Sequence, residues 1–424
     1  MTFDYVCGII VKNGKGRTIF MIKRENYLSK IRPFINQTEL VKVIVGVRRS
    51  GKSVMLELIK EELFSSGVPI ENTISINFED MSYSGLRNAQ ALHDELKKRI
   101  EGINGRAYLF LDEIQEVDEW ERCINSLRVN SDADIYITGS NATLLSGEYA
   151  TVLSGRYVEF TVYPFSFAEY CEIRNSGTEK NDARTLFTEY VKYGGLPFLA
   201  SVPLDGQAKS QYLKDIYASV IIKDIVKRNK LRDVELLERI LAYAAANIGR
   251  IFSANSISAY FKNEKRPVSV DTVINYLSSC EKAFLFHRIS RVDLEGKELL
   301  KLNEKYYLSD HGFRQAICGT NQKDIELILE NIVCLEMLRR GYKVMIGKLN
   351  DKEIDFVCDK NGKRIYVQVT YMLASEKTLM REFGAYDGIR DNYPKYVVSM
   401  DDFDMSQNGI IHMNIRDFLL NFSE

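Results

Sequence analysis

The spacing of apolar residues predicts strands that alternate with helices over roughly the first 160 residues. Helical spacing, with apolar residues three or four positions apart, occurs at residues 54–63, 89–100 and 120–127. β-rich runs lie at residues 40–45, 72–78, 107–111, 133–138 and 157–162, and the run at 107–111 is wholly apolar, as is typical of a strand buried on both faces. Strands that alternate with helices in this way favour an α/β fold built on a parallel sheet.

A glycine-rich segment, GVRRSGKS at residues 46–53, joins the first strand to the first helix. It matches the phosphate-loop pattern G-x-x-x-x-G-K-[S/T], in the strand–turn–helix context that the pattern requires. Gly46 and Gly51 allow the backbone N–H groups to turn toward an anion, and the helix start adds its positive end. A glycine turn with solvated charges is the alternative. The predicted nucleotide-binding residues are Gly46, Val47, Arg48, Arg49, Ser50, Gly51, Lys52, Ser53 and Val54.

Two carboxylates end the third predicted strand, in the sequence AYLFLDE at residues 107–113. Open parallel sheets bind their ligands at the carboxyl ends of the strands. After a phosphate loop, we expect Asp112 to hold Mg²⁺ together with the Ser53 hydroxyl, and Glu113 to activate the attacking water. Lys52 would contact the β- and γ-phosphates. The alternative, a strand that ends in two surface acids, is disfavoured by the phosphate loop.

Three further polar residues flank the remaining two strands. Ser140 and Asn141 come directly after the strand at 133–138, where Asn141 would contact the γ-phosphate or the attacking water. Either residue could instead cap the next helix. Arg156 precedes the strand at 157–162 and could stabilise transition-state charge in its own chain or in a neighbouring subunit. A surface arginine is the alternative for Arg156.

Composition limits the partners and the compartment that we expect for the protein. Lys and Arg number 57 against 58 Asp and Glu, so no overall charge attracts nucleic acid. Seven cysteines without a C-x-x-C pair, and four histidines, indicate neither a zinc site nor a disulfide framework, which favours a reducing cytoplasm. No apolar run approaches the roughly 20 residues that span a bilayer, so no membrane partner is expected. Residues 1–20 are expected to be an appendage, with Met21 as the start of the protein.

The remainder of the chain divides into three predicted segments after an ATPase-like core at residues 21–165. Residues 166–232 read as a helical lid, broken by YGGLP at residues 193–197. A basic cluster at residues 223–230 is interpreted as a solvated face. Residues 233–309 and 310–424 form the other two segments.

Residues 233–309 carry the pattern of a winged helix-turn-helix, three helices followed by a hairpin. Such a module can place its third helix in the major groove of double-stranded DNA, here with Thr272 and Asn275 exposed. It can equally bind a protein. The expected helices are 235–244, 253–261 and 269–277, and the expected strands are 284–292 and 299–308.

Residues 310–424 predict a nuclease-like fold with a degenerate metal site. A metal-dependent nuclease of this kind needs an acid on a helix, an Asp on one strand, and Glu/Asp-x-Lys on the next. Gln368 and Thr370 stand where the third acid and the lysine belong, and Lys363 and Lys377 are candidate substitutes. The predicted degenerate site is Glu330, Asp355, Gln368 and Thr370.

Five motifs resemble the prokaryotic AAA-type ATPases that carry a winged helix and a C-terminal restriction-endonuclease-like domain of the PD-(D/E)XK type. The resemblance implies a Mg²⁺-dependent ATPase and runs from about Met21 to the end of the chain. The terminal sequences EIDFV and YVQV extend it, and the departures at Gln368 and Thr370 argue against nuclease activity. The five motifs are GVRRSGKS (46–53), FLDEIQEV (110–117), TGSNA (138–142), SGRYVEFTVYPFSFAEY (154–170) and YGGLP (193–197).

The resemblance also implies roles for single residues. Lys52, Ser53 and Asp112 would bind ATP and its Mg²⁺, and Glu113 would activate the attacking water. Asn141 would be the first sensor and Arg156 an arginine finger. Gly195 and Pro197 would form a hinge. An arginine finger acting between subunits would require a homo-oligomer.

Three functions remain open: an ATP-hydrolysing switch, an ATP-gated DNA nuclease, and a non-enzymatic DNA-binding scaffold. The presence of Lys52, Ser53, Asp112 and Glu113 together argues against the scaffold, and Gln368 argues against the nuclease. We predict the switch.

Overall fold

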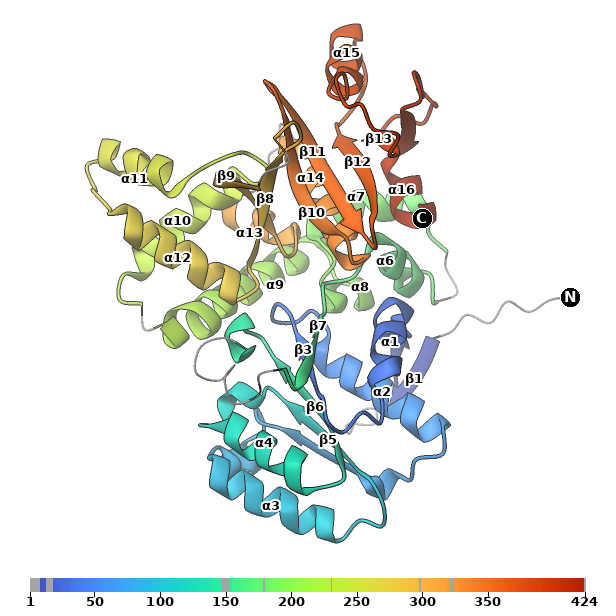
Figure 1. The fold of residues 1–424 in the computed structure, drawn as a ribbon, viewed down its shortest axis with the longest axis vertical. Coiled ribbons are helices and arrows are strands. Elements are labelled where there is room, and N and C mark those ends of the chain that lie inside the picture. The colour runs from blue at the N-terminus through green and yellow to red at the C-terminus, as the bar shows by residue number, and fades with distance from the viewer. Residues whose placement is uncertain are drawn as a thin grey trace, which may run out of the picture. The chain divides into compact units, whose positions relative to one another are not determined.

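A computed structural model describes residues 8–12, 18–145, 153, 155–177, 180–229, 231–296, 299–319 and 324–422 (Figure 1). The chain forms two compact units. The first comprises Met1–Pro164 with Lys282–Phe284, and the second comprises Phe165–Glu281 and Leu285–Glu424. The segments predicted separately as 166–232, 233–309 and 310–424 therefore share one compact unit.

The first unit is built on a five-stranded parallel sheet, as the apolar runs predict. The strand order is β4-β5-β6-β3-β7, so the chain direction across the sheet reverses beside β3. In open α/β sheets, ligands bind at such a reversal, beyond the carboxyl ends of the strands. The strands are β3 (Val41–Val45), β4 (Thr73–Asn77), β5 (Ala107–Asp112), β6 (Ala133–Gly139) and β7 (Tyr157–Thr161).

Helices cover both faces of this sheet (Figure 1). α1 and α2 pack with Ile44, Phe110 and Tyr136 in one buried cluster, and on the other side α3 packs against α4, which contacts β6. The helices are α1 (Glu25–Ile31), α2 (Lys52–Ser65), α3 (Ala89–Glu101) and α4 (Trp120–Asn130), with 3₁₀ turns η1 (Arg32–Phe34), η2 (Ile70–Asn72), η3 (Met81–Leu86), η4 (Ile114–Glu116) and η5 (Ala142–Leu145).

A small hairpin precedes the core. Strand β1 (Gly8–Lys12) pairs antiparallel with β2 (Thr18–Ile22). Met21 is buried in the cluster formed by α1 and α2. The hairpin therefore runs across the predicted boundary between residues 20 and 21.

The second unit begins with helices and continues through the predicted hairpin. A π-helical stretch, which is rare in proteins, extends α9. The helices are α6 (Phe167–Arg174), α7 (Ala183–Tyr193), α8 (Pro197–Ser201), α9 (Gly206–Ser219), η6 (Val220–Lys227), α10 (Val234–Ala246), α11 (Ala254–Asn263), α12 (Val270–Lys282), α13 (Gly312–Cys318), α14 (Ile325–Arg339), α15 (Glu376–Gly384) and α16 (Ile415–Asn421).

One seven-stranded sheet runs through this unit, in the order β14-β13-β12-β11-β10-β8-β9. β8 pairs antiparallel with β9 and parallel with β10, so the predicted boundary at 309/310 lies within a continuous sheet. α14 packs against β9, β10, β11 and β12. The strands are β8 (Phe286–Asp293), β9 (Leu299–Leu308), β10 (Lys343–Leu349), β11 (Lys352–Lys360), β12 (Lys363–Val369), β13 (Lys395–Ser399) and β14 (Ile411–Asn414).

The surface predictions for this unit are partly met. Asn275 is exposed on α12, but Thr272 is half-buried, and its N–H donates to Ser269 Oγ at 3.1 Å as part of the helix cap. In the basic stretch, Lys223 and Lys227 are exposed, and Arg228 pairs with Asp224 at 3.4 Å. Lys230 lies outside the described residues. Among the helices of the described chain, none combines the length and hydropathy of a membrane span.

Candidate functional site

Three loops meet at the carboxyl edge of the first unit's sheet. β3 pairs with β6 in a register that places Val45 opposite Gly139, and β4 pairs with β5 so that Asn77 lies opposite Asp112. All these strands are parallel, so the segments that follow them emerge at the same edge. The sheet therefore brings the phosphate loop, the Asp112–Glu113 pair and the Ser140–Asn141 segment together.

The phosphate loop depends on two glycines. Gly46 has φ 148° and Gly51 has φ 102°, values that side chains rarely tolerate. A Cβ at Gly46 would lie 2.2 Å from the Val162 carbonyl oxygen, so the loop and the end of β7 pack too closely for any other residue. Within the described residues no side chain caps the start of α2, and its first turn has no acid. The first amides of α2 therefore suit an anion.

Lys52 lies under this loop and is almost fully buried. Its Nζ donates to the carbonyl oxygens of Gly46 and Val47, both at 3.2 Å, and stands 3.9 Å from Glu113 Oε1. The ammonium group is thus held between the loop and a carboxylate. That position suits a cation that will meet phosphate oxygens.

Asp112 is buried at the end of β5. Thr138 donates its hydroxyl to Asp112 Oδ1, and Asn77 Nδ2 donates to Oδ2 at 3.2 Å. Burial raises the pKa of Asp112, while hydrogen bonds from Thr138 and from the exposed Ser53 oppose that rise. A buried carboxylate beside a hydroxyl offers the oxygen ligands that Mg²⁺ prefers.

Glu113 adopts a strained backbone. Its φ of 57° is in the left-handed region, which is uncommon for a residue with a side chain and concentrates at functional sites. Its N–H donates to Thr138 Oγ1 at 2.9 Å, and Gln115 Nε2 donates to its Oε2. Thr138 therefore orients both carboxylate residues from the neighbouring strand.

The other predicted loop residues have different surroundings. Arg48 is nearly buried, and its Nη1 pairs with Glu79 Oε1 at 3.0 Å, while Arg49 is exposed with φ 68°. Ser50 is fully buried, and its hydroxyl has no hydrogen-bond partner among the described residues. Val54 packs against the α1–α2 cluster. An orphaned hydroxyl and uncapped amides within one loop fit a polyanionic ligand.

Sequence reasoning missed Arg24, which binds the backbone of the phosphate loop and of the segment after β7. Its Nη1 donates to the Ser50 carbonyl oxygen at 3.0 Å and its Nη2 to the Tyr163 carbonyl oxygen at 2.8 Å. The guanidinium stacks on Tyr27 with 4.5 Å from Cζ to the ring centroid. Thr138, Asn77 and Gln115 were also missed. Thr138 and Gln115 lie inside the TGSNA and FLDEIQEV motifs, but the motifs alone do not single out their roles.

The structure separates the two remaining candidates. Asn141 is buried after β6, at the carboxyl edge that carries the phosphate loop, and both its sensor and its capping interpretations remain open. Arg156 lies at the opposite edge, because its carbonyl oxygen accepts from the N–H of Val41, the first residue of β3. Its side chain is exposed. Arg156 therefore cannot reach the site of its own chain, and the interpretation in cis is wrong.

The second unit brings together most of the predicted nuclease-like residues. Gln368 Oε1 accepts from the Asp355 N–H at 3.2 Å, and Lys305 Nζ lies 3.0 Å from Glu330 Oε1 and 3.9 Å from Asp355 Oδ1. The cluster thus contains a lysine that the sequence did not identify. Among the described residues, no group of His, Cys, Asp or Glu is arranged to hold a metal ion.

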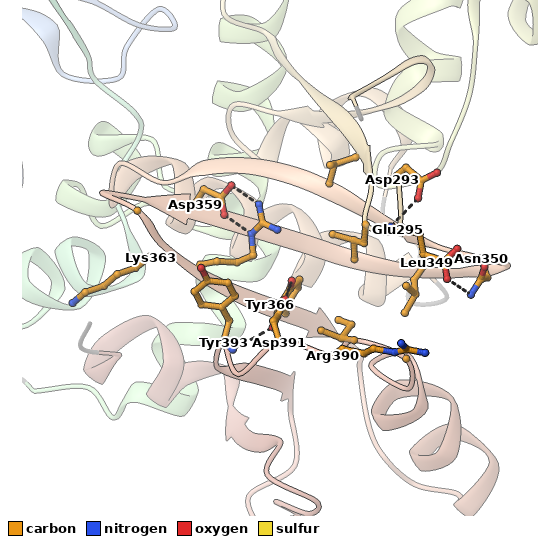
Figure 2. A pocket seen from close by; sticks show the side chains of 16 residues that line it. Asp293, Glu295, Leu349, Asn350, Asp359, Lys363, Tyr366, Arg390, Asp391 and Tyr393 are labelled. Carbon is orange, nitrogen blue, oxygen red and sulfur yellow. Dashed lines mark hydrogen bonds and ion pairs between the residues drawn. The ribbon is translucent and has the colours of Figure 1, made fainter. Parts of the chain in front are cut away.

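No hydrogen bond or ion pair of the described residues links the suggested substitutes for the missing lysine to this cluster. Lys363 lines a separate hollow of about 1210 Å³ on the second unit (Figure 2), and Lys377 is exposed on α15. Thr370 is buried after β12, and its N–H donates to the Val398 carbonyl oxygen at 3.0 Å.

Two pairs of side chains that line the hollow in Figure 2 are bound to each other. Arg364 makes a two-pronged pair with Asp359, and Tyr366 donates its hydroxyl to Asp391 Oδ2 at 2.6 Å. These four side chains therefore satisfy one another.

A parallel sheet with a phosphate loop beside paired carboxylates is the arrangement of a P-loop ATPase-like domain. Residues 38–171 match the family model described as "AAA domain", and residues 184–324 match a domain of unknown function (DUF8612). The predicted AAA-type class is thereby confirmed. The winged-helix and nuclease-like assignments receive no such support.

The chain belongs to the same family as two uncharacterized proteins. The Haemophilus influenzae protein is 39% identical over 401 residues, covering 94% of this chain and 99% of that protein. MJ1544 of Methanocaldococcus jannaschii is 30% identical over 361 residues, covering 82% of this chain and 78% of that protein. The Walker-type ATPase PABY2304 of Pyrococcus abyssi has a similar fold, with a TM-score of 0.51 at 14% identity over 73% of this chain and 98% of that chain.

Proposed function

We propose that the protein is an ATP-hydrolysing molecular switch. The observation that carries the proposal is the convergence of Lys52, Asp112 and Glu113 at one sheet edge, with Lys52 Nζ 3.9 Å from Glu113 Oε1. The uncapped start of α2 at this edge supports phosphate binding.

In the proposed reaction, water attacks the γ-phosphorus of ATP and the bond to the β-phosphate oxygen breaks, giving ADP and phosphate. Glu113 accepts the proton of the attacking water, and Lys52 binds the β- and γ-phosphate oxygens. Ser53 and Asp112 would hold Mg²⁺, which when bound neutralises phosphate charge. Asn141 would orient the water or the γ-phosphate.

The switch would reach the second unit through the chain segment after β7. Tyr163 is bound by Arg24, which also binds the phosphate loop. Two residues later the second unit begins, and the N–H of Phe165 donates to the Gly195 carbonyl oxygen at 2.7 Å. We assign the coupling to this segment because a shift of the loop on phosphate binding would pull on Tyr163 directly.

In this proposal, the two parts of the second unit bind the partner on which the switch acts. We propose a winged helix for α10–α12 with β8 and β9, and a nuclease-like fold without nuclease activity for the C-terminal strands. α12 exposes Asp271, Ile274 and Asn275 and carries no Lys or Arg before Lys282. Phosphate contacts need such cations, so this face favours a protein partner over double-stranded DNA. Duplex binding that weakens steeply with salt would reverse that preference.

Steady-state ATP hydrolysis and ATP binding of the full chain test the central proposal. Lys52→Ala should weaken ATP binding and reduce hydrolysis by about tenfold or more. Glu113→Gln should keep ATP binding but reduce hydrolysis by about 100-fold, the typical contribution of a general base. Exposed residues on α3 provide matched controls, Lys98→Ala and Glu101→Gln, which should behave as wild type. Hydrolysis by Glu113→Gln at the wild-type rate would refute the role of Glu113.

A further inference from the structure

A buried lysine lies at the centre of an acidic cluster in the second unit. The Lys305 side chain, on β9, is 2% exposed. Its Nζ lies 3.0 Å from Glu330 Oε1, 2.7 Å from Glu353 Oε1 and 3.9 Å from Asp355 Oδ1. One ammonium group therefore faces three carboxylates that come from α14 and β11.

Neighbouring donors hold these carboxylates in place. The Tyr307 hydroxyl donates to Glu330 Oε1 at 2.6 Å. The N–H of Val369 donates to Asp355 Oδ2 at 2.8 Å. The backbone therefore binds one carboxylate oxygen of Asp355, and the other faces Lys305.

The backbone between α10 and α11 closes one side of the cluster. Gly249 has φ 69°, and its N–H donates to the Tyr306 carbonyl oxygen at 3.3 Å. A Cβ at this position would lie 2.8 Å from Glu330 Oε2. A large substrate such as a nucleic-acid strand could not reach the Glu330 carboxylate from this side without moving that turn.

We propose that Lys305 is the resident cation of this cluster and occupies the place where a nuclease-like fold would bind a divalent metal. Mg²⁺ binds carboxylate oxygens at about 2.0–2.1 Å. The ammonium group already contacts the oxygens of Glu330 and Glu353 that a metal ion would use. A metal ion would have to displace the ammonium group, because two cations at this place would repel each other strongly. The second unit thus completes this cluster from its own side chains.

The charges around Lys305 agree with this assignment. Burial opposes the charge of Lys305, but the attraction of Glu330, Asp355 and Glu353 is larger and raises its pKa above the ordinary value. Burial also raises the pKa of Glu330 and of Asp355. Arg291 Nη2, 3.9 Å from Glu353 Oε2, adds a second positive charge beside these acids.

Mn²⁺ titration of the nucleotide-free full chain, followed by thermal unfolding, tests the proposal. In the wild-type protein, the thermal unfolding midpoint of the second unit should be the same in EDTA and in Mn²⁺. Lys305→Met removes the cation, so its unfolding midpoint should fall in EDTA and rise again with Mn²⁺. Adding Glu353→Gln to Lys305→Met should abolish that rise, because it removes a carboxylate from the opened cluster.

The exposed Lys343→Met, on β10, serves as the matched control and should behave as wild type. Lys305→Ala, which leaves more space, is the second variant if Lys305→Met does not fold. Failure of both Lys305 variants to respond to Mn²⁺ would overturn the proposal. Mn²⁺ binding by wild type that Asp355→Asn removes would overturn it as well.

Discussion

Asp310 accepts a hydrogen bond from the backbone N–H of Gly195 at 2.8 Å, across 115 residues of sequence. Its other carboxylate oxygen accepts from the N–H of Gly312, also at 2.8 Å. The turn predicted as a hinge is therefore held by a buried carboxylate within the second unit. A switch that moves this turn has to break or carry along the Asp310 contact.

Replacing Gly194 should destabilise this turn. Gly194 has φ 80°, and a Cβ there would lie 1.8 Å from Asp310 Oδ1. Gly194→Ala should therefore lower the free energy of unfolding of the second unit by more than about 1 kcal/mol. Chemical denaturation measures the loss. Gly177→Ala is the control, because a Cβ there meets no atom within 4 Å, and equal stability of the two variants would contradict the prediction.

Asp310 should make stability depend on pH in a defined window. Burial raises its pKa from 3.8 to about 7, although two backbone N–H donors and Arg339 oppose the rise. The stabilisation from the neutral acid is complete below about pH 4 and is lost as pH rises through about 7. The wild-type free energy of unfolding should therefore fall relative to that of Asp310→Asn, by up to about 1.4 kcal/mol per pH unit.

Urea denaturation of both proteins across this range measures the difference. Other titrating groups are shared by the two proteins and cancel. The lost acceptor in Asp310→Asn adds an offset that does not change with pH. A difference that stays constant from pH 4 to 8 would show that Asp310 is ionised throughout.

Arg24 should affect nucleotide binding more than its distance from the chemistry suggests. It binds the Ser50 and Tyr163 carbonyl oxygens together, and the single ammonium group of a lysine cannot reproduce that fork. Arg24→Lys and Arg24→Met should lower the rise in unfolding midpoint caused by ATP, and raise KM. The exposed Arg122→Met is the control. Lower midpoints with an unchanged ATP response would indicate a structural role alone.

Arg156 should act only between subunits. It lies at the sheet edge opposite the phosphate loop, so only a second copy of the chain could bring it to the γ-phosphate. Arg156→Ala should retain ATP binding and lose most hydrolysis. Mixing it with Lys52→Ala should restore part of the activity, because each mixed interface can combine an intact loop with an intact arginine. No recovery on mixing, with a monomeric protein at assay concentration, would exclude Arg156 from the reaction.

The sequence predicted the local features of the first unit well. The phosphate loop could be recognised because its chemistry lies in eight consecutive residues with fixed glycine positions. The five strands were predicted from β-rich, mostly apolar runs; β3, β5 and β6 are buried along their whole length, whereas β4 and β7, at the two edges of the sheet, are partly exposed. Asp112 and Glu113 followed from the position of two acids at a strand end.

Lys42 shows where this reasoning stops. It interrupts the apolar run of β3, yet its side chain is completely buried and pairs with Asp134 on β6. Neither residue signals its partner, because the pairing depends on the register of two strands that are about 90 residues apart. Burial of one charge without the other would destabilise the sheet, so the fold selects the pair.

What the sequence by itself determined is therefore the strands and helices of the parallel sheet, the phosphate loop and the class of chemistry. Only the tertiary structure decided which residues surround that chemistry. Thr138 binds both Asp112 and Glu113, Arg24 binds the phosphate loop, and Lys305 lies among the acids of the second unit. The tertiary structure also places Arg156 at the edge of the sheet opposite the phosphate loop. The physical reason is that strand order and register create these contacts, and both are set by packing between segments that are distant in sequence.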